Sequence, residues 1–127
     1  MSTTAHRYED AVARYFAAWN AENPAARAKA VAVARTEEGG YTDPLADVSG
    51  HEGIAAVIAA AREQFPGFAF RLTGGVDGHH DTACFSWEPV SAADGSAPVA
   101  GSDVIILDAQ GRIKAVLGFL DRVPAGA

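Results

Sequence analysis

The first half of the chain places apolar residues every three or four positions, a spacing that gives a helix one apolar face. In residues 7–22 these positions are Tyr8, Val12, Tyr15, Phe16 and Trp19. Asn23 and Pro24 then predict the start of a second helix, because asparagine caps helices and proline fits their first turn. We expect this helix to run to about Arg35 and the glycine pair 39–40 to end it.

Further along the chain the pattern changes to an alternation of apolar and polar residues, which is typical of strands with one buried face. A short strand at residues 41–43, a loop at 45–49 and a third helix at 50–64 precede this change. Four long strands are then predicted at residues 68–76, 81–90, 99–107 and 112–123. Three helices followed by such a meander predict an α+β fold, in which the helices cover one face of a strongly bent, mainly antiparallel sheet. This arrangement leaves an apolar pocket between the layers, where small ligands usually bind.

Length and composition limit the class of protein. The 127 residues predict a single domain, residues 1–127, with a frayed tail at 124–127. Its 49% of apolar and 20% of charged residues are typical of globular proteins, and its net charge of −6 argues against nucleic-acid and anionic-membrane partners. A single cysteine excludes an intrachain disulfide, and no signal peptide or membrane-spanning run is evident, so we expect a cytoplasmic protein.

Three polar side chains lie in otherwise apolar surroundings and are the candidates for chemistry. Tyr15 is on the apolar face of the first helix, Asp43 lies in the segment 41–44, and Asp103 directly precedes the apolar run 104–107. Segments that bury a face usually avoid Asp, because an unpaired buried carboxylate is costly. If the three converge on one pocket, they supply a base and a pair of hydrogen-bond donors, the minimum for proton transfer beside a carbonyl group.

Each of these residues also has a structural interpretation. Asp43 can cap a turn before Pro44, since Asp-Pro is a common turn starter. Asp103 can lie at a strand edge, in solvent or paired with Arg71. Tyr15 can be a core tyrosine with a satisfied hydroxyl group.

The remaining candidates are residues that would bind a substrate or line its pocket and would not take part in the chemistry. Seven residues are candidates for substrate binding, although each also fits the core: Trp19, Phe70, Phe85, Trp87, Val116, Gly118 and Leu120. The run His79-His80-Asp81 resembles a metal motif, but neighbouring strand residues point to opposite faces, so we expect no metal site and keep His80 alone as a candidate pocket donor. We expect His51 to lie solvated at a helix start and Cys84 to be inert.

Four stretches, residues 13–16, 41–44, 49–50 and 103–113, resemble the nuclear transport factor 2-like superfamily, and within it the ketosteroid isomerase and SnoaL-type polyketide cyclase branches. The resemblance extends from about residue 13 to residue 123. It implies a cone-shaped fold, chemistry without a cofactor, a hydrophobic small-molecule ligand and a homodimer formed through the outer face of the sheet.

The resemblance also implies a role for each candidate. Asp43 corresponds to the general base, and Tyr15 and a protonated Asp103 correspond to the two donors to the oxyanion. Val57 and Ile58 replace a Phe-Tyr pair of the steroid enzymes, and Leu120 replaces a tryptophan of some isomerases, which argues against a steroid substrate.

The sequence therefore favours an isomerase or an aldol-type cyclase that acts on a hydrophobic carbonyl compound. A binding or accessory module of the same fold is the alternative, because fold does not fix function. Epoxide hydrolysis of the limonene epoxide hydrolase type ranks third. It needs an Asp–Arg–Asp set, of which Arg71 and Asp103 offer a part and for which no second acid is convincing.

Overall fold

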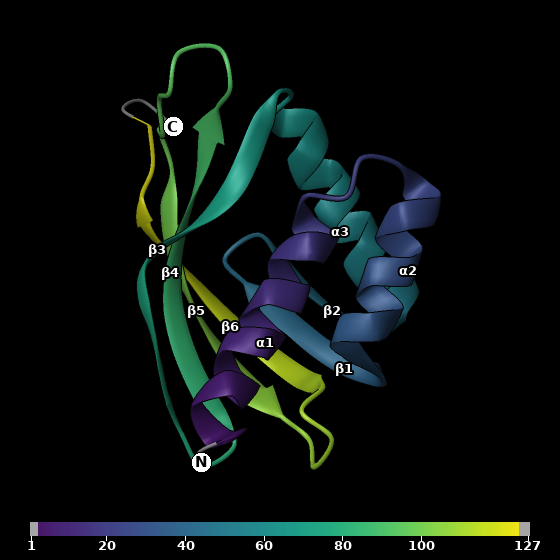
Figure 1. Cartoon of the computed structure of the whole chain (residues 1–127). Coiled ribbons are helices and arrows are strands. Elements are labelled where there is room, and N and C mark those ends of the chain that lie inside the picture. The colour runs from purple at the N-terminus through teal and green to yellow at the C-terminus, as the bar shows by residue number, and fades with distance from the viewer. Residues whose placement is uncertain (1–2, 125–127) are drawn as a thin grey trace.

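The computed structural model describes residues 3–124, which form three helices and six strands (Figure 1). The elements are α1 (Thr3–Trp19), α2 (Pro24–Ala34), β1 (Arg35–Asp43), β2 (Ala46–Ser49), α3 (Gly50–Gln64), β3 (Phe68–His79), β4 (Thr82–Ser91), β5 (Ala100–Leu107) and β6 (Ile113–Arg122). The tail predicted at 124–127 lies outside the described residues except for Pro124.

The six strands form one curved sheet in the order β2-β1-β6-β5-β4-β3. All neighbouring pairs are antiparallel except β1 and β6, which run parallel. The three helices pack on one side of this sheet (Figure 1). The core lies between these layers, where Val31, Ile105, Leu107 and Ile113 are fully buried. The α+β prediction with helices on one face of a bent sheet is thereby confirmed.

Local signals placed several helix ends correctly. The Asn23 side chain accepts a hydrogen bond from the backbone N–H of Ala26 at 2.8 Å, as expected for the residue that caps α2. Helix α3 covers the predicted range. Helix α1, in contrast, ends at Trp19 and not at residue 22, because the Asn20 side chain bonds both backbone groups of Phe70 on β3. None of the helices within residues 3–124 is both long and apolar enough to cross a membrane.

The region between α2 and α3 differs from the prediction. The glycine pair 39–40 does not follow a helix directly but lies within β1, which begins at Arg35. A side chain at Gly39 would lie 3.2 Å from a backbone oxygen of β6, so glycine allows the two strands to approach at an irregularity in their register. Residues 46–49, predicted as loop, form β2 and pair with β1. This extra hairpin places Asp43 at the end of β1, close to β6.

Candidate active site

Tyr15 and Asp103 meet in the core between α1 and β5. The Tyr15 hydroxyl donates a hydrogen bond of 2.5 Å to Oδ2 of Asp103, and the two side chains are only 4% and 2% exposed. Tyr15 comes from the apolar face of α1, and Asp103 from the inward-facing positions of β5. The first two sequence candidates therefore form one buried hydrogen-bonded pair.

Asp43 forms a second such pair at the end of β1. The Tyr41 hydroxyl donates a hydrogen bond of 2.5 Å to Oδ2 of Asp43. The other carboxylate oxygen, Oδ1, accepts the backbone N–H groups of Leu45 and Ala46, both at 2.8 Å. Asp43 thus caps the hairpin between β1 and β2, as its structural interpretation proposed. It is also half-buried and close to the other candidates.

Gly118 on β6 is the point at which the two pairs approach each other. It is paired with Asp103 in the sheet. A Cβ atom at this position would lie 2.8 Å from Oδ1 of Asp103 and 3.2 Å from Cβ of Asp43. Both acidic side chains therefore lie against Gly118, and any larger residue at this position would displace at least one of them.

Arg35 is a site residue that the sequence did not reveal. Its side chain is 2% exposed, and its Nη2 atom donates to the backbone oxygen of Gly40 at 2.5 Å. Its charge acts on Tyr15, Tyr41 and Asp103, so it lies among both pairs. Arg71, the partner considered for Asp103, is exposed, whereas Asp103 is buried, so this pairing does not form.

Burial determines how these groups ionise. Desolvation raises the pKa of Asp103 to about 6, the hydrogen bond from Tyr15 opposes this rise, and the charge of Asp43 adds to it. Burial and the neighbouring carboxylates also raise the pKa values of Tyr15 and Tyr41, so both hydroxyls remain donors at neutral pH. A pKa of about 6 leaves Asp103 mostly ionised at pH 7, where the resemblance had implied a protonated acid.

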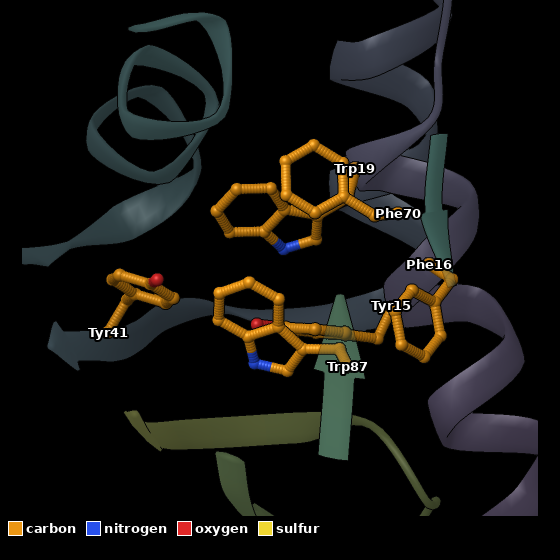
Figure 2. Close-up of a pocket in the computed structure, with 6 residues that line it drawn as sticks. All are labelled: Tyr15, Phe16, Trp19, Tyr41, Phe70 and Trp87. Atoms are coloured by element: carbon orange, nitrogen blue, oxygen red, sulfur yellow. The ribbon is translucent and has the colours of Figure 1, made fainter. Parts of the chain in front are cut away.

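A narrow cavity of about 10 Å³ opens beside these pairs, enough for roughly one water molecule. Six aromatic residues line it: Tyr15, Phe16, Trp19, Tyr41, Phe70 and Trp87. Figure 2 shows their side chains facing one another from α1, β1, β3 and β4. The Trp19 and Phe70 rings are 5.1 Å apart between centroids, and those of Phe70 and Trp87 are 6.1 Å apart. The rings thus close a space that a substrate would need to open.

Three of the seven residues expected to line the pocket border the cavity, and four do not. Trp19, Phe70 and Trp87 border the cavity. Phe85 packs against Tyr15 at 5.4 Å between ring centroids, within the core, and Val116 is fully buried there. Gly118 lies under the two acids, and Leu120 is half-buried near the end of β6. Phe16 and Tyr41 line the cavity without having been assigned to it from the sequence.

His79 and His80 lie away from this site. His80 has a left-handed backbone with a φ of 51°, and its Nδ1 atom is 3.1 Å from that of His79, so the expectation that the two point to opposite faces is wrong. His80 is exposed and does not border the cavity. His51 Nε2 is 3.0 Å from the backbone oxygen of Thr36. Within residues 3–124, no group of three or more His, Cys, Asp or Glu side chains is placed to hold a metal ion.

Comparison with known proteins identifies the family of the chain. The family model of the SnoaL-like domain matches residues 12–116. The chain belongs to the SnoaL-like family. The predicted membership and its cone-shaped fold are thereby confirmed.

Solved structures of this family are similar over most of the chain. A candidate isomerase of the SnoaL-like family from Agrobacterium tumefaciens str. C58 is 43% identical, with a TM-score of 0.85 over 91% of this chain and 98% of that one. A candidate SnoaL-like polyketide cyclase from Jannaschia sp. CCS1 shares the fold at 19% identity, with a TM-score of 0.77 over 95% and 90% of the two chains. No curated protein sequence matches the chain.

Proposed function

We propose that this SnoaL-like protein catalyses proton transfer on a hydrophobic carbonyl compound without a cofactor, as an isomerase or an aldol-type cyclase. The observation that carries the proposal is the approach of the pairs Tyr15–Asp103 and Tyr41–Asp43 over Gly118, beside an aromatic cavity. A buried acid with a pKa of about 6 and hydroxyls that stay protonated are typical of acid–base sites. The similarity to a candidate isomerase and a candidate cyclase supports the same class of reaction.

In this proposal Asp43 is the base. Its carboxylate removes a proton from the carbon next to the carbonyl group, and the electrons of that C–H bond form the enolate. Tyr15 and Asp103 stabilise the enolate oxygen. In the free protein the only Tyr15 O–H hydrogen is donated to Asp103, so Asp103 takes up one proton from solvent when the ketone binds. The Tyr15 and Asp103 O–H groups can then both donate to the enolate oxygen, whose developing negative charge raises the pKa of Asp103 further. One well-placed donor contributes about 10²–10³-fold to the rate, and a positioned base about 10²–10⁴-fold.

A substrate enters this site only when the aromatic rings move. The closed cavity of about 10 Å³ is far smaller than the 300–1,000 Å³ (roughly) of ordinary ligand pockets. Phe16 is partly exposed and lies at the edge of the cavity, so rotation of its ring away from Tyr15 and Phe85 would open the space.

The proposal is tested with 2-tetralone, a flat bicyclic ketone, in D₂O. The wild-type protein is expected to accelerate exchange of the protons next to the carbonyl group for deuterium, followed by proton NMR. Asp43→Asn removes the base but keeps an oxygen that can accept the N–H groups of Leu45 and Ala46, so the hairpin is retained. We expect this variant to lose the rate by at least about 10²-fold.

The matched control is Asp47→Asn, since Asp47 is an exposed acid on β2 of the same hairpin. It should keep the wild-type rate. Full activity of Asp43→Asn would refute the base assignment. Binding of the ketone by the wild type without any exchange would instead favour the alternative, a binding module.

A second candidate function, epoxide hydrolysis, gains support from one observation. Buried Arg35, together with Asp103 and Asp43, supplies the Asp–Arg–Asp set that was incomplete in the sequence. One carboxylate would take a proton from the attacking water while the other, protonated, would donate to the epoxide oxygen. Conversion of cyclohexene oxide to its diol by the wild type, and loss of that conversion in Arg35→Met, would support this reaction.

We also infer that the protein forms a homodimer through the outer face of the sheet. Phe119 is 60% exposed there and Leu117 is 39% exposed, on the face of β6 that the helices do not cover. Large apolar side chains that are neighbours on an exposed sheet face commonly mark an interface.

A further inference from the structure

The indole N–H of Trp87 is a polar group of the cavity wall that the proposed proton transfer does not use. Trp87 lies on β4 and borders the cavity together with Tyr15 and Tyr41 (Figure 2). Its Nε1 atom is buried and makes no hydrogen bond with any residue of the described chain. A buried donor without a partner costs free energy, so a site that keeps one points to a partner that binds there.

A glycine on the neighbouring strand fixes the position of this indole. Gly101 on β5 is paired with Trp87 in the sheet. A Cβ atom at Gly101 would lie 2.2 Å from Cζ2 and 2.5 Å from Cε2 of Trp87, so only glycine accommodates the ring. Since Cε2 is bonded to Nε1, the N–H edge is the part of the ring that lies over Gly101. The backbone of β5 therefore determines where the donor sits.

The donor lies next to the reacting groups. Asp103 follows Gly101 by two residues on β5, on the same inward face. The Trp87 side chain is close enough to lower the pKa of Asp103, although the atoms do not meet the geometry of a hydrogen bond. An oxygen atom that accepts the indole N–H would consequently lie beside the Tyr15–Asp103 pair.

The surroundings of this donor define the ligand that fits. Aromatic rings form the walls, which favours a flat and largely apolar molecule. Asp43 and Asp103 approach each other over Gly118 and are hydrogen-bonded to the lining residues Tyr41 and Tyr15, so their charges repel a carboxylate in the cavity. We propose that Trp87 is a ligand-binding residue whose indole N–H holds the carbonyl oxygen of a flat, neutral, cyclic ketone beside Tyr15 and Asp103. The identity of this oxygen as a carbonyl rests on the proposed function.

The test compares 2-tetralone with tetralin, the hydrocarbon of the same shape that lacks the oxygen. The protein has two tryptophans, Trp19 and Trp87, so ¹⁵N-labelled protein gives two indole signals, which Trp19→Phe and Trp87→Phe assign. We expect saturation with 2-tetralone to shift the Trp87 indole proton downfield. Trp87→Phe should weaken binding of 2-tetralone by about 3–10-fold, the loss of one hydrogen bond, and binding of tetralin by less than about 2-fold, since an aromatic ring remains.

Trp19→Phe is the matched control, because it alters a ring of the same wall and leaves the Trp87 N–H in place. It should change the affinities for the two ligands by the same factor. Equal losses for both ligands in Trp87→Phe, an unchanged Trp87 indole signal at saturation, or no binding of 2-tetralone by the wild type would each overturn the inference. Deuterium exchange without a Trp87 shift refutes this inference alone. A Trp87 shift without exchange refutes the proposed catalysis alone.

Discussion

Replacing Asp103 with asparagine should change the pH dependence of stability in a defined direction. Burial raises the pKa of Asp103 from its ordinary value of 3.8 to about 6. Because one pKa unit corresponds to about 1.36 kcal/mol, ionised Asp103 costs the folded state about 3 kcal/mol relative to the unfolded chain. The folded-state pKa is the higher one, so the stabilising contribution is complete below about pH 4 and is lost as the pH rises through about 6. The variant Asp103→Asn has no group here that titrates and does not share this loss.

The measurement is urea unfolding of both proteins at intervals between about pH 4 and pH 8. Tyr15, Arg35 and Asp43 act on Asp103 and are present in both proteins, so the difference between the two curves reports on the Asp103 carboxyl group and its interactions with them. We expect the free energy of unfolding of the variant, relative to that of the wild type, to rise by about 2.5 kcal/mol between pH 4 and pH 8. A difference that stays constant within about 1 kcal/mol would mean that Asp103 is solvated. A gain by the wild type as the pH rises would mean that Arg35 outweighs desolvation.

Three further variants test other parts of the site. Gly118→Ala should displace Asp103 or Asp43, because its Cβ atom would lie too close to both. We expect the deuterium-exchange rate measured by NMR to fall at least about 10-fold, and urea unfolding to show a loss of stability of roughly 1–3 kcal/mol. Wild-type values in both measurements would contradict the close approach of the two acids over Gly118. Arg35→Met removes a positive charge that opposes the rise in the pKa of Asp103, so a ¹³C titration of this carboxyl group should give a value above about 6, and a lower value would refute the placement of Arg35. Phe119→Ser should convert a dimer to a monomer in light scattering and leave proton exchange intact, whereas an unchanged mass would exclude this face as the interface.

Helices with local signals and the four long alternating strands were predicted from the sequence, whereas strand β2 and the end of α1, which depend on distant partners, were not. Helix α3 and the start of α2 depend on periodicity and on the Asn23 cap, which are local. Strand β2 has four residues, too few to show an alternation, and exists because it pairs with β1 after a turn that Asp43 caps. The end of α1 likewise depends on Asn20, whose partner lies 50 residues away.

The sequence could indicate only those site residues whose polar side chains are unusual for their apolar surroundings. Tyr15 and Asp103 are polar groups within apolar runs, and the structure brings them together. Arg35 follows an alanine-rich helix, where a cation has an ordinary explanation in the helix dipole, so nothing in the sequence indicated that it is buried. Phe85 and Trp87 alternate on one face of β4, yet only Trp87 borders the cavity, because the path of α1 decides which residue it covers.

Asp43 both closes a turn and accepts a hydrogen bond from Tyr41, which lines the cavity, and this double role has an evolutionary consequence. Asparagine can accept the same backbone N–H groups but cannot take up a proton, and the codons of the two amino acids differ by one base. A single mutation could therefore convert a catalyst of this kind into a ligand carrier while its architecture persists. Descendants that bind without reacting would be expected to arise often on this scaffold, and the residue at this turn would distinguish them.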